Sequence, residues 1–335
     1  MTKSSKARER TDISEEEDLE LERQLSVLNK PPIKTFMTEE GDILDCIDIY
    51  KQPAFDHPLL KNHKIQMRHS FFPRQVANKT SSSGAKELHI KLKGKKCPMG
   101  TVPIRRTSKE DLIRAKSISR KFPTSFGLPT PSFARQYRVS IKIDHDRPLH
   151  GVSANINVYN PPVKGGQFSS AQLWVQNGPY DYINNIQAGW MVNPYLYNDN
   201  HTRFFTFWTD SNTGNWFLSV TDDNIVVGYW PGGIFPNLGK GASSVLWGGL
   251  AQASTDGISP PMGSGHFPYD KDFRHSSFFK NMKYMDPFSS WTDPGWPGQT
   301  EFTDNKNCYD LKNDKYKDKE WGNTFRFGGP GGKCG

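Results

Sequence analysis

Paired carboxylates can activate water without a metal, because one accepts its proton while the other donates to the developing oxyanion. Residues 135–335 contain only two glutamates, Glu301 and Glu320, which lie 19 residues apart. Both fall in a loop-rich stretch, whereas catalytic carboxylates normally project from rigid strands that face one cleft. We therefore do not expect Glu301 and Glu320 to form a catalytic pair.

Other patterns of reactive residues are weaker. His266 and His275 lack the spacing of metal ligands, and the glycine-rich stretch 328–332 is not followed by the Lys-Ser/Thr of a phosphate loop. No residue stands in a Gly-x-Ser-x-Gly nucleophile motif. The basic stretch 91–96 has few aromatic neighbours on which bases could stack. These patterns predict no metal, no cofactor and no nucleic-acid partner.

Charge and aromatic residues divide the chain into two parts. Residues 1–134 hold 25 Lys and Arg against 17 Asp and Glu, while residues 135–335 hold 18 of each and all nine Trp. No apolar run approaches the ~20 residues that span a bilayer, so no membrane segment is expected. The predicted organisation is a disordered start at 1–13, a first domain at 14–122, a proline-rich linker at 123–134 and a second domain at 135–335.

The first domain is predicted to be a small mixed α and β unit. Ser14 and Glu17 have capping-box spacing, and Leu21, Leu25 and Leu28 follow at helical intervals. The remaining expectations are a second capping box at 107–110 that opens another helix, a strand at 88–92, and an irregular stretch at 40–75.

The second domain is predicted to be an antiparallel β-sandwich, which makes the whole chain mainly β. Apolar residues alternate with polar ones from Tyr137 to Ile143, and turn residues separate the later segments at the spacing typical of sandwiches. Further strands are expected at 154–158, 170–176, 204–208, 216–220, 225–230 and 244–247.

The cysteines and sequons favour an oxidising compartment. The four cysteines are widely spaced, and of their three possible connectivities we expect pairing within each half, Cys46–Cys97 and Cys308–Cys334. Asn78 and Asn200 each begin an Asn-x-Thr sequon. Met1–Glu20 has no apolar core and is not a signal peptide. Either a leader lies outside this sequence or the chain does not enter the secretory route.

Ordered motifs along nearly the whole chain resemble the neprosin family, plant glutamic peptidases that cleave after proline. Segments 45–55, 64–67 and 97–106 resemble the activation peptide of that family. Seven further segments resemble the catalytic part of that family: 154–161, Gln176-Asn177-Gly178-Pro179, Ala188-Gly189-Trp190, 227–231, Trp247-Gly248-Gly249, 307–310 and 327–332. The resemblance implies a secreted or vacuolar zymogen whose activation peptide is 14–122 and whose catalytic-like β-sandwich is 135–335.

The sequence departs from the family at its two catalytic glutamates. One should precede Ala-Gly-Trp, where this chain has Gln187, and the other should follow Trp-Gly-Gly, where it has Leu250. The resemblance makes Trp190 and Trp247 their neighbours in the cleft. An amide cannot accept a proton at a working pH and an alkyl group cannot exchange one at all. We therefore expect a pseudoenzyme that has lost peptidase activity.

A third departure is a missing stretch. In the family, further strands separate a Phe-x-x-Trp-Thr segment from a Gly-Asn-Trp segment, but here Asp210 runs almost directly into Thr213. The expected partners are a Pro-containing peptide in the cleft and the chain's own prodomain. Two alternatives stay open: a residual peptidase that uses another carboxylate, such as Asp181 or Glu301, and a module that binds peptide or cell-wall glycan.

Overall fold

The computed structural model describes residues 14–38, 41–67, 96–121, 135–179, 182–208, 215–220, 225–269, 272–295 and 298–335. The chain divides into two compact units, one of Met1–His63 and His89–Lys116, the other of Lys64–Leu88 and Ser117–Gly335. The strand predicted at 88–92 and the sequon asparagine Asn78 lie outside the described residues. Within them, no helix is long and apolar enough to cross a membrane.

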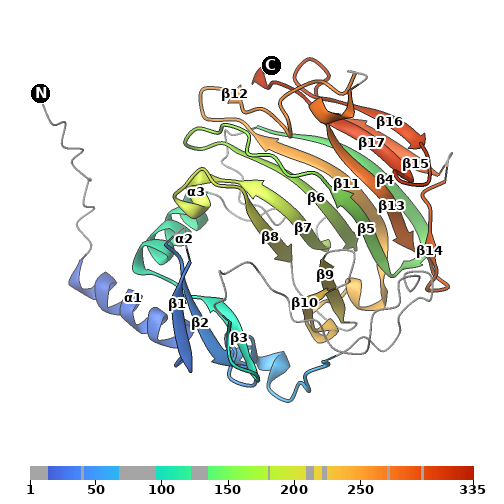
Figure 1. Ribbon diagram of the computed structural model, residues 1–335. Helices are drawn as coiled ribbons and strands as arrows, with labels where there is room; N and C mark the ends of the chain where they lie inside the picture. The colour runs from blue at the N-terminus through green and yellow to red at the C-terminus, as the bar shows by residue number, and fades with distance from the viewer. Residues whose placement is uncertain are drawn as a thin grey trace, which may run out of the picture. The chain divides into compact units, whose positions relative to one another are not determined.

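The first unit combines two α-helices with a three-stranded antiparallel sheet of order β1-β2-β3 (Figure 1). Its elements are α1 (Glu15–Leu28), β1 (Lys34–Met37), β2 (Ile43–Asp48), the 3-10 turns η1 (Pro53–Asp56) and η2 (Pro58–Leu60), β3 (Thr101–Arg105) and α2 (Lys109–Lys121). The prediction of an irregular 40–75 is therefore wrong at β2. The strand order places β2 at the centre of the sheet. Its residue Cys46 is fully buried, and Asp45 beside it is nearly so.

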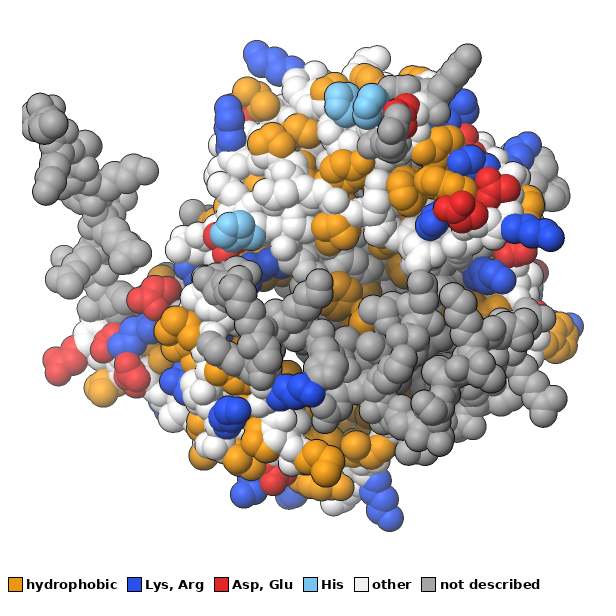
Figure 2. Space-filling view, in the orientation of Figure 1, with side chains coloured by type: hydrophobic (Ala, Val, Ile, Leu, Met, Phe, Trp, Pro, Cys, Tyr) orange, Lys and Arg blue, Asp and Glu red, His pale blue; other side chains and the backbone are white. Residues whose placement is uncertain are grey.

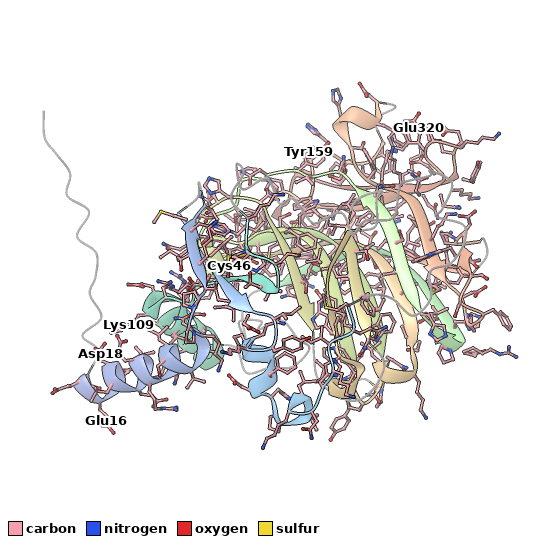
Figure 3. All side chains as sticks on the ribbon, turned by 60° about the horizontal axis from the view of Figure 1, so that its bottom comes forward. Glu16, Asp18, Cys46, Lys109, Tyr159 and Glu320 are labelled. Carbon is pink, nitrogen blue, oxygen red and sulfur yellow. A yellow bond between two sulfur atoms is a disulfide. The ribbon has the colours of Figure 1, made fainter. Side chains whose placement is uncertain are left out.

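Both predicted helices form, and side chains cap them. Ser14 Oγ accepts a hydrogen bond from the backbone N–H of Glu17, as the capping box predicted. The second box lies one residue later than expected, because Ser108 and Asp111 exchange side-chain and backbone hydrogen bonds. Lys109 on α2 is 2.9 Å from the Asp18 carboxylate on α1, and Figure 3 shows the two side by side. Figure 2 shows acidic and basic side chains interspersed along this part of the surface.

Asp45 gives this unit a measurable response to acid. Two hydrogen bonds from the Arg106 guanidinium, at 2.7 and 2.6 Å, hold the pKa of Asp45 below its ordinary value of 3.8. Because the folded pKa is lowered, the pair stabilises the fold above the unfolded pKa and its contribution disappears as pH falls through the folded pKa.

We therefore expect Asp45→Asn to destabilise this sheet by about 2 kcal/mol at pH 7 and by less at pH 2. Hydrogen exchange of the β2 amides in the full chain measures the difference. Asp56→Asn, at an ion pair on the surface, is the control and should have little effect at either pH. An equal effect of Asp45→Asn at both pH values would contradict the prediction.

The second unit is a β-sandwich, which confirms the mainly β, antiparallel prediction for the chain. One sheet has six strands in the order β15-β4-β11-β6-β7-β8, and the other has the order β14-β13-β17-β16 with β5 paired to β13 (Figure 1). The first sheet comprises β4 (Gln136–Leu149), β6 (Phe168–Asn177), β7 (Asn184–Val192), β8 (Arg203–Trp208), β11 (Ala242–Gln252) and β15 (Gln299–Thr303). The second comprises β5 (Gly151–Ile156), β13 (Ser277–Met285), β14 (Trp291–Thr292), β16 (Asp310–Tyr316) and β17 (Asn323–Gly328).

Short elements complete this unit. They are α3 (Pro194–Tyr197), the hairpin of β9 (Trp216–Val220) and β10 (Ile225–Trp230), the 3-10 turns η5 (Gly232–Ile234), η6 (Leu238–Lys240) and η7 (Phe273–His275), and the pair β12 (Ile258–Ser259) and β18 (Gly332–Lys333). Strand β8 is the last strand of its sheet, and in the described part of the chain β9 and β10 pair only with each other.

Large aromatic side chains fill the space between the two sheets. Phe279 on β13 stacks on Phe325 at a centroid distance of 5.0 Å, and both rings contact Phe327. A Cβ atom at Gly249 on β11 would lie 2.7 Å from the ring of Phe327 on β17, so the two sheets come close together at this glycine. The odd-numbered face of β11 therefore packs in the core, and its even-numbered face points away from the second sheet.

Both predicted disulfides are present. Cys46 on β2 is bonded to Cys97 in the first unit, and Cys308 is bonded to Cys334 in the second. No cysteine is left free. The second bond attaches the segment after β17 to the segment before β16, which holds two distant parts of the chain together.

Candidate functional site

The two positions of the family glutamates lie on the same face of the six-stranded sheet. Leu250 on β11 pairs with Ser170 on β6, and Gln187 on β7 pairs with Trp174 on β6. Residues that pair directly across antiparallel strands share a face, and even-numbered positions alternate with odd ones along each strand. Since Ser170 and Trp174 are four residues apart on β6, Gln187 and Leu250 both lie on the face that points away from the core.

Gln187 is held by a second amide. Its side chain is 4% exposed, and its Oε1 accepts a hydrogen bond of 2.5 Å from Nε2 of Gln172 on β6. The pair is neutral, so neither side chain accepts a proton from water. What the amide of Gln187 retains is one hydrogen-bond donor group, which can orient a carbonyl oxygen but cannot act as a base.

Leu250 belongs to an apolar cluster. It packs with Phe168 and Met191, which are all nearly buried, and Tyr197 lies against the group. A carboxylate at position 250 would have to be taken from water into this cluster, which strongly disfavours the charged form. The surroundings of position 250 are therefore adapted to the leucine.

Two glycines of the family motifs lie beside these positions. Gly248 on β11 and Gly189 on β7 both pair directly with Gln172 of β6, one on each side of that strand. A Cβ atom at Gly189 would be 2.1 Å from the Ala171 carbonyl oxygen, and one at Gly248 would be 2.1 Å from that of Val139. No other residue fits at either position, because the neighbouring strand occupies the space.

Trp190 and Trp247, expected as cleft neighbours, lie on the opposite face. Trp190 pairs with Ala171, and Trp247 pairs with Leu173, so both side chains point toward the second sheet. Trp247 is fully buried. Their indole N–H groups donate to the carbonyl oxygens of Asn157, at 2.9 Å, and Ser153, at 3.1 Å. The family spacing identified them as neighbours along the chain, but alternation along a strand separates them from Gln187 and Leu250 in space.

The alternative carboxylates do not join the two positions. Glu301 on β15 pairs with Ile141, hence lies on the core-facing side of the sheet, and accepts a hydrogen bond of 2.9 Å from Asn313. Glu320 is exposed in the turn after β16 (Figure 3). Asp181 lies outside the described residues. None of the carboxylates considered from the sequence is therefore placed at the site by the described structure.

Sequence reasoning did not identify one carboxylate that shares the outer face. Asp144 on β4 accepts one hydrogen bond from Ser244 Oγ at 2.5 Å and forms an ion pair of 2.7 Å with Lys142. Its place follows from the alternation of β4, which puts even-numbered residues on this face. Among the described residues, no group of three or more potential metal ligands is found.

The sequon at Asn200 lies on the surface between α3 and β8. Asn200 is exposed, and Thr202 Oγ1 donates to the carbonyl oxygen of Tyr159 and to Oδ1 of Asn160, each at 2.7 Å. The threonine of the sequon is therefore anchored while its asparagine is accessible. Tyr159 follows β5, and Figure 3 labels it.

Family models match most of the chain. The neprosin activation peptide matches residues 35–145, and the neprosin domain matches residues 165–213 and 209–330. The second match consists of two pieces that meet at 209–213, where a stretch of the family sequence was expected to be missing. The same place separates β8 from the hairpin of β9 and β10.

Proposed function

Because the chain belongs to the neprosin family, we propose that it is a glutamic-peptidase homologue without peptidase activity, which binds a Pro-containing peptide on the outer face of its six-stranded sheet. The observation that carries the proposal is the state of the two glutamate positions. Gln187 is held in a neutral amide pair, and Leu250 is part of an apolar cluster. Neither position offers the proton acceptor that water attack on a peptide bond requires.

The size of the catalytic loss supports this proposal. A positioned acid or base typically contributes 10²–10⁴-fold to the rate, and here both members of the pair are replaced. Residues that act as a unit are not additive, so the first replacement already removes most of the effect. Asp144 does not compensate, since its carboxylate is bound to Ser244 and Lys142.

Peptide binding rests on chemistry that the substitutions leave in place. The amide of Gln187 remains a donor for a carbonyl oxygen, and the outer face of β6 keeps the polar side chains Ser170 and Gln172. The Pro-containing substrate class comes from the family. We further propose a secreted or vacuolar location in a plant, with an N-linked glycan on Asn200, in keeping with the two disulfides.

The chain carries its own prodomain, and a short piece of it belongs to the second unit. Lys64–Met67 lies within the activation-peptide match and clusters with the sandwich. The backbone N–H of Gln66 donates to Tyr229 Oη at 2.9 Å, and Asn215 Nδ2 donates to Gln66 Oε1 at 2.7 Å. Tyr229 on β10 therefore binds the backbone of Gln66, and Asn215, which precedes β9, binds its side chain.

Restoring the two glutamates tests the catalytic part. The full chain, its single variants Gln187→Glu and Leu250→Glu, and the double variant are incubated with a Pro-containing peptide at pH ~4, and cleavage products are identified by mass spectrometry. We expect cleavage by the double variant only. Gln176→Glu/Gln252→Glu adds two carboxylates to the same face at neighbouring positions, two residues from Trp174 on β6 and two from Leu250 on β11, and should be silent.

Cleavage by the unmodified chain would refute the loss of activity. Silence of the double variant in a folded state would show that the absent family stretch, rather than the two glutamates alone, limits the chemistry. Titration calorimetry of the unmodified chain with the same peptide tests the binding part, and absence of heat at millimolar peptide would refute it.

A further inference from the structure

A four-residue segment of the activation-peptide match lies against the sandwich. Residues 64–67 belong to no helix or strand, and they cluster with the second unit although the residues before them cluster with the first. Ile65 and Gln66 are half-buried, while Lys64 and Met67 on either side are exposed. The sandwich therefore holds this segment by its two middle residues, and the contacts of Gln66 are the specific ones.

Two side chains of the second unit bind Gln66. Its backbone N–H donates to Tyr229 Oη at 2.9 Å, and its side-chain Oε1 accepts a hydrogen bond from Asn215 Nδ2 at 2.7 Å. Tyr229 lies on β10 and Asn215 directly precedes β9, and these two strands form one hairpin (Figure 1). One end of this hairpin therefore contacts both the main chain and the side chain of a single residue.

Neighbouring contacts hold both side chains in position. The backbone N–H of Gly232 donates to Asn215 Oδ1 at 2.7 Å, which fixes the amide orientation and leaves Nδ2 as the donor toward Gln66. Phe217 pairs with Tyr229 across the hairpin, and their rings stack at a centroid distance of 5.0 Å. The hairpin and the turn that follows it therefore position the donor and the acceptor independently of the segment that they bind.

The chemistry of this pair of groups suits one kind of residue. The Tyr229 hydroxyl accepts from a backbone N–H, which proline lacks, so proline is disfavoured at this position. The Asn215 amide donates to an oxygen at the end of a side chain of glutamine length, which alanine and other short or apolar residues do not offer. The place of Gln66 shows directly that a glutamine fits between the two groups.

We propose that Asn215 and Tyr229 form a subsite for a glutamine of a peptide, and that Gln66 occupies this subsite as an intramolecular ligand. Another peptide that carries a glutamine binds at the same place once Gln66 has left it. The proposal goes beyond the proposed function and does not depend on it, because the outer face of the six-stranded sheet takes no part. It gives the hairpin a preference for glutamine that proline recognition does not contain.

Removal of the intramolecular ligand tests the subsite. Gln66→Pro in the full chain lacks both the N–H and the side-chain oxygen, so neither bond to the hairpin can form. A synthetic peptide with the sequence of residues 62–69 is titrated into this variant and into the unmodified chain by calorimetry. We expect the variant to bind it at least ~10-fold more tightly, because in the unmodified chain the peptide competes with a tethered Gln66 at millimolar effective concentration.

Gln52→Pro is the matched control for this substitution. Gln52 lies in the first unit, its side chain bonds to the Ile49 carbonyl oxygen, and its φ of −61° is one that proline adopts. This variant should bind the peptide as weakly as the unmodified chain. Circular dichroism verifies that both proline variants are folded before they are compared.

Companion peptides and further variants assign the two bonds. With Gln66→Pro, a peptide that has alanine in place of its glutamine should bind about 5-fold less tightly, and one that has proline there at least ~10-fold less tightly. Adding Asn215→Ala should make the glutamine and alanine peptides bind equally. Adding Tyr229→Phe should weaken both and keep their difference. Asn307→Ala, at an exposed asparagine of the same unit, should change neither affinity.

Several results would overturn the proposal. If the glutamine peptide does not bind to Gln66→Pro, or binds no better than the alanine peptide, the hairpin has no glutamine subsite. Equal binding to Gln66→Pro and to the unmodified chain would show that Gln66 does not occupy the place where the peptide binds. A glutamine preference that survives Asn215→Ala would assign it to another group. None of these results affects the proposed function, which is tested with a Pro-containing peptide that carries no glutamine.

Discussion

Replacing Trp247 with alanine will lower the free energy of unfolding of the sandwich by about 3–5 kcal/mol. The indole is fully buried between the two sheets, and its N–H is bonded to the Ser153 carbonyl oxygen. The substitution leaves a large cavity and also deprives that buried carbonyl of its donor. Guanidinium denaturation followed by circular dichroism measures the change without relying on tryptophan fluorescence.

Trp291 provides the matched control for this experiment. It lies on the short strand β14 and is partly exposed, so Trp291→Ala should cost far less than Trp247→Ala. The comparison also separates two roles for Trp247. If Trp247→Ala keeps its stability but loses affinity for peptide, Trp247 contacts the peptide and does not lie in the core.

Asp314→Asn is expected to destabilise the second sheet by a similar amount, about 3–5 kcal/mol. Arg326 on β17 is 2% exposed, and its guanidinium makes two hydrogen bonds to the Asp314 carboxylate, at 2.8 and 2.9 Å. Phe273 lies 4.2 Å from the guanidinium. Removal of the carboxylate charge weakens the two charge-assisted hydrogen bonds that Asp314 provides to this buried cation.

Thermal and denaturant unfolding of Asp314→Asn measures the loss. Asp18→Asn, which removes the charge of an exposed ion pair with Lys109, is the control and should change stability by less than about 1 kcal/mol. The double variant Arg326→Leu/Asp314→Leu should recover much of the loss, because it removes the buried positive charge together with Asp314. A loss in Asp314→Asn no larger than in the control would show that Arg326 is accessible to water.

Much of the fold follows from local patterns. Alternation located β4 and β5, the spacing of turn residues located β6, β8, β9, β10 and β11, and Ser14 located the start of α1. The sequence of β7 shows no alternation of apolar and polar residues, because both faces of this strand are largely buried. Gln187 and Gly189 lie on its outer face. Aromatic contacts between the sheets stabilise β13 and β17, and a short stretch of sequence does not reveal such contacts.

The surroundings of Gln187 and Leu250 could not be predicted from the sequence. Family spacing located Gln187 and Leu250, and strand register then shows that they share a face. The partner of Gln187 could not be inferred, because Gln172 is 15 residues away on another strand.

The strand spacing at Gly189 and Gly248 has a consequence for how such chains diverge. Any side chain at these glycines collides with the adjacent backbone, so the Ala-Gly-Trp and Trp-Gly-Gly signatures are maintained by the geometry of the sheet. Gln187 precedes the first signature and Leu250 follows the second, and both lie on the outer face of the sheet. The two signatures therefore report the architecture of the sheet, and by themselves they do not report the reactivity of the residues beside them.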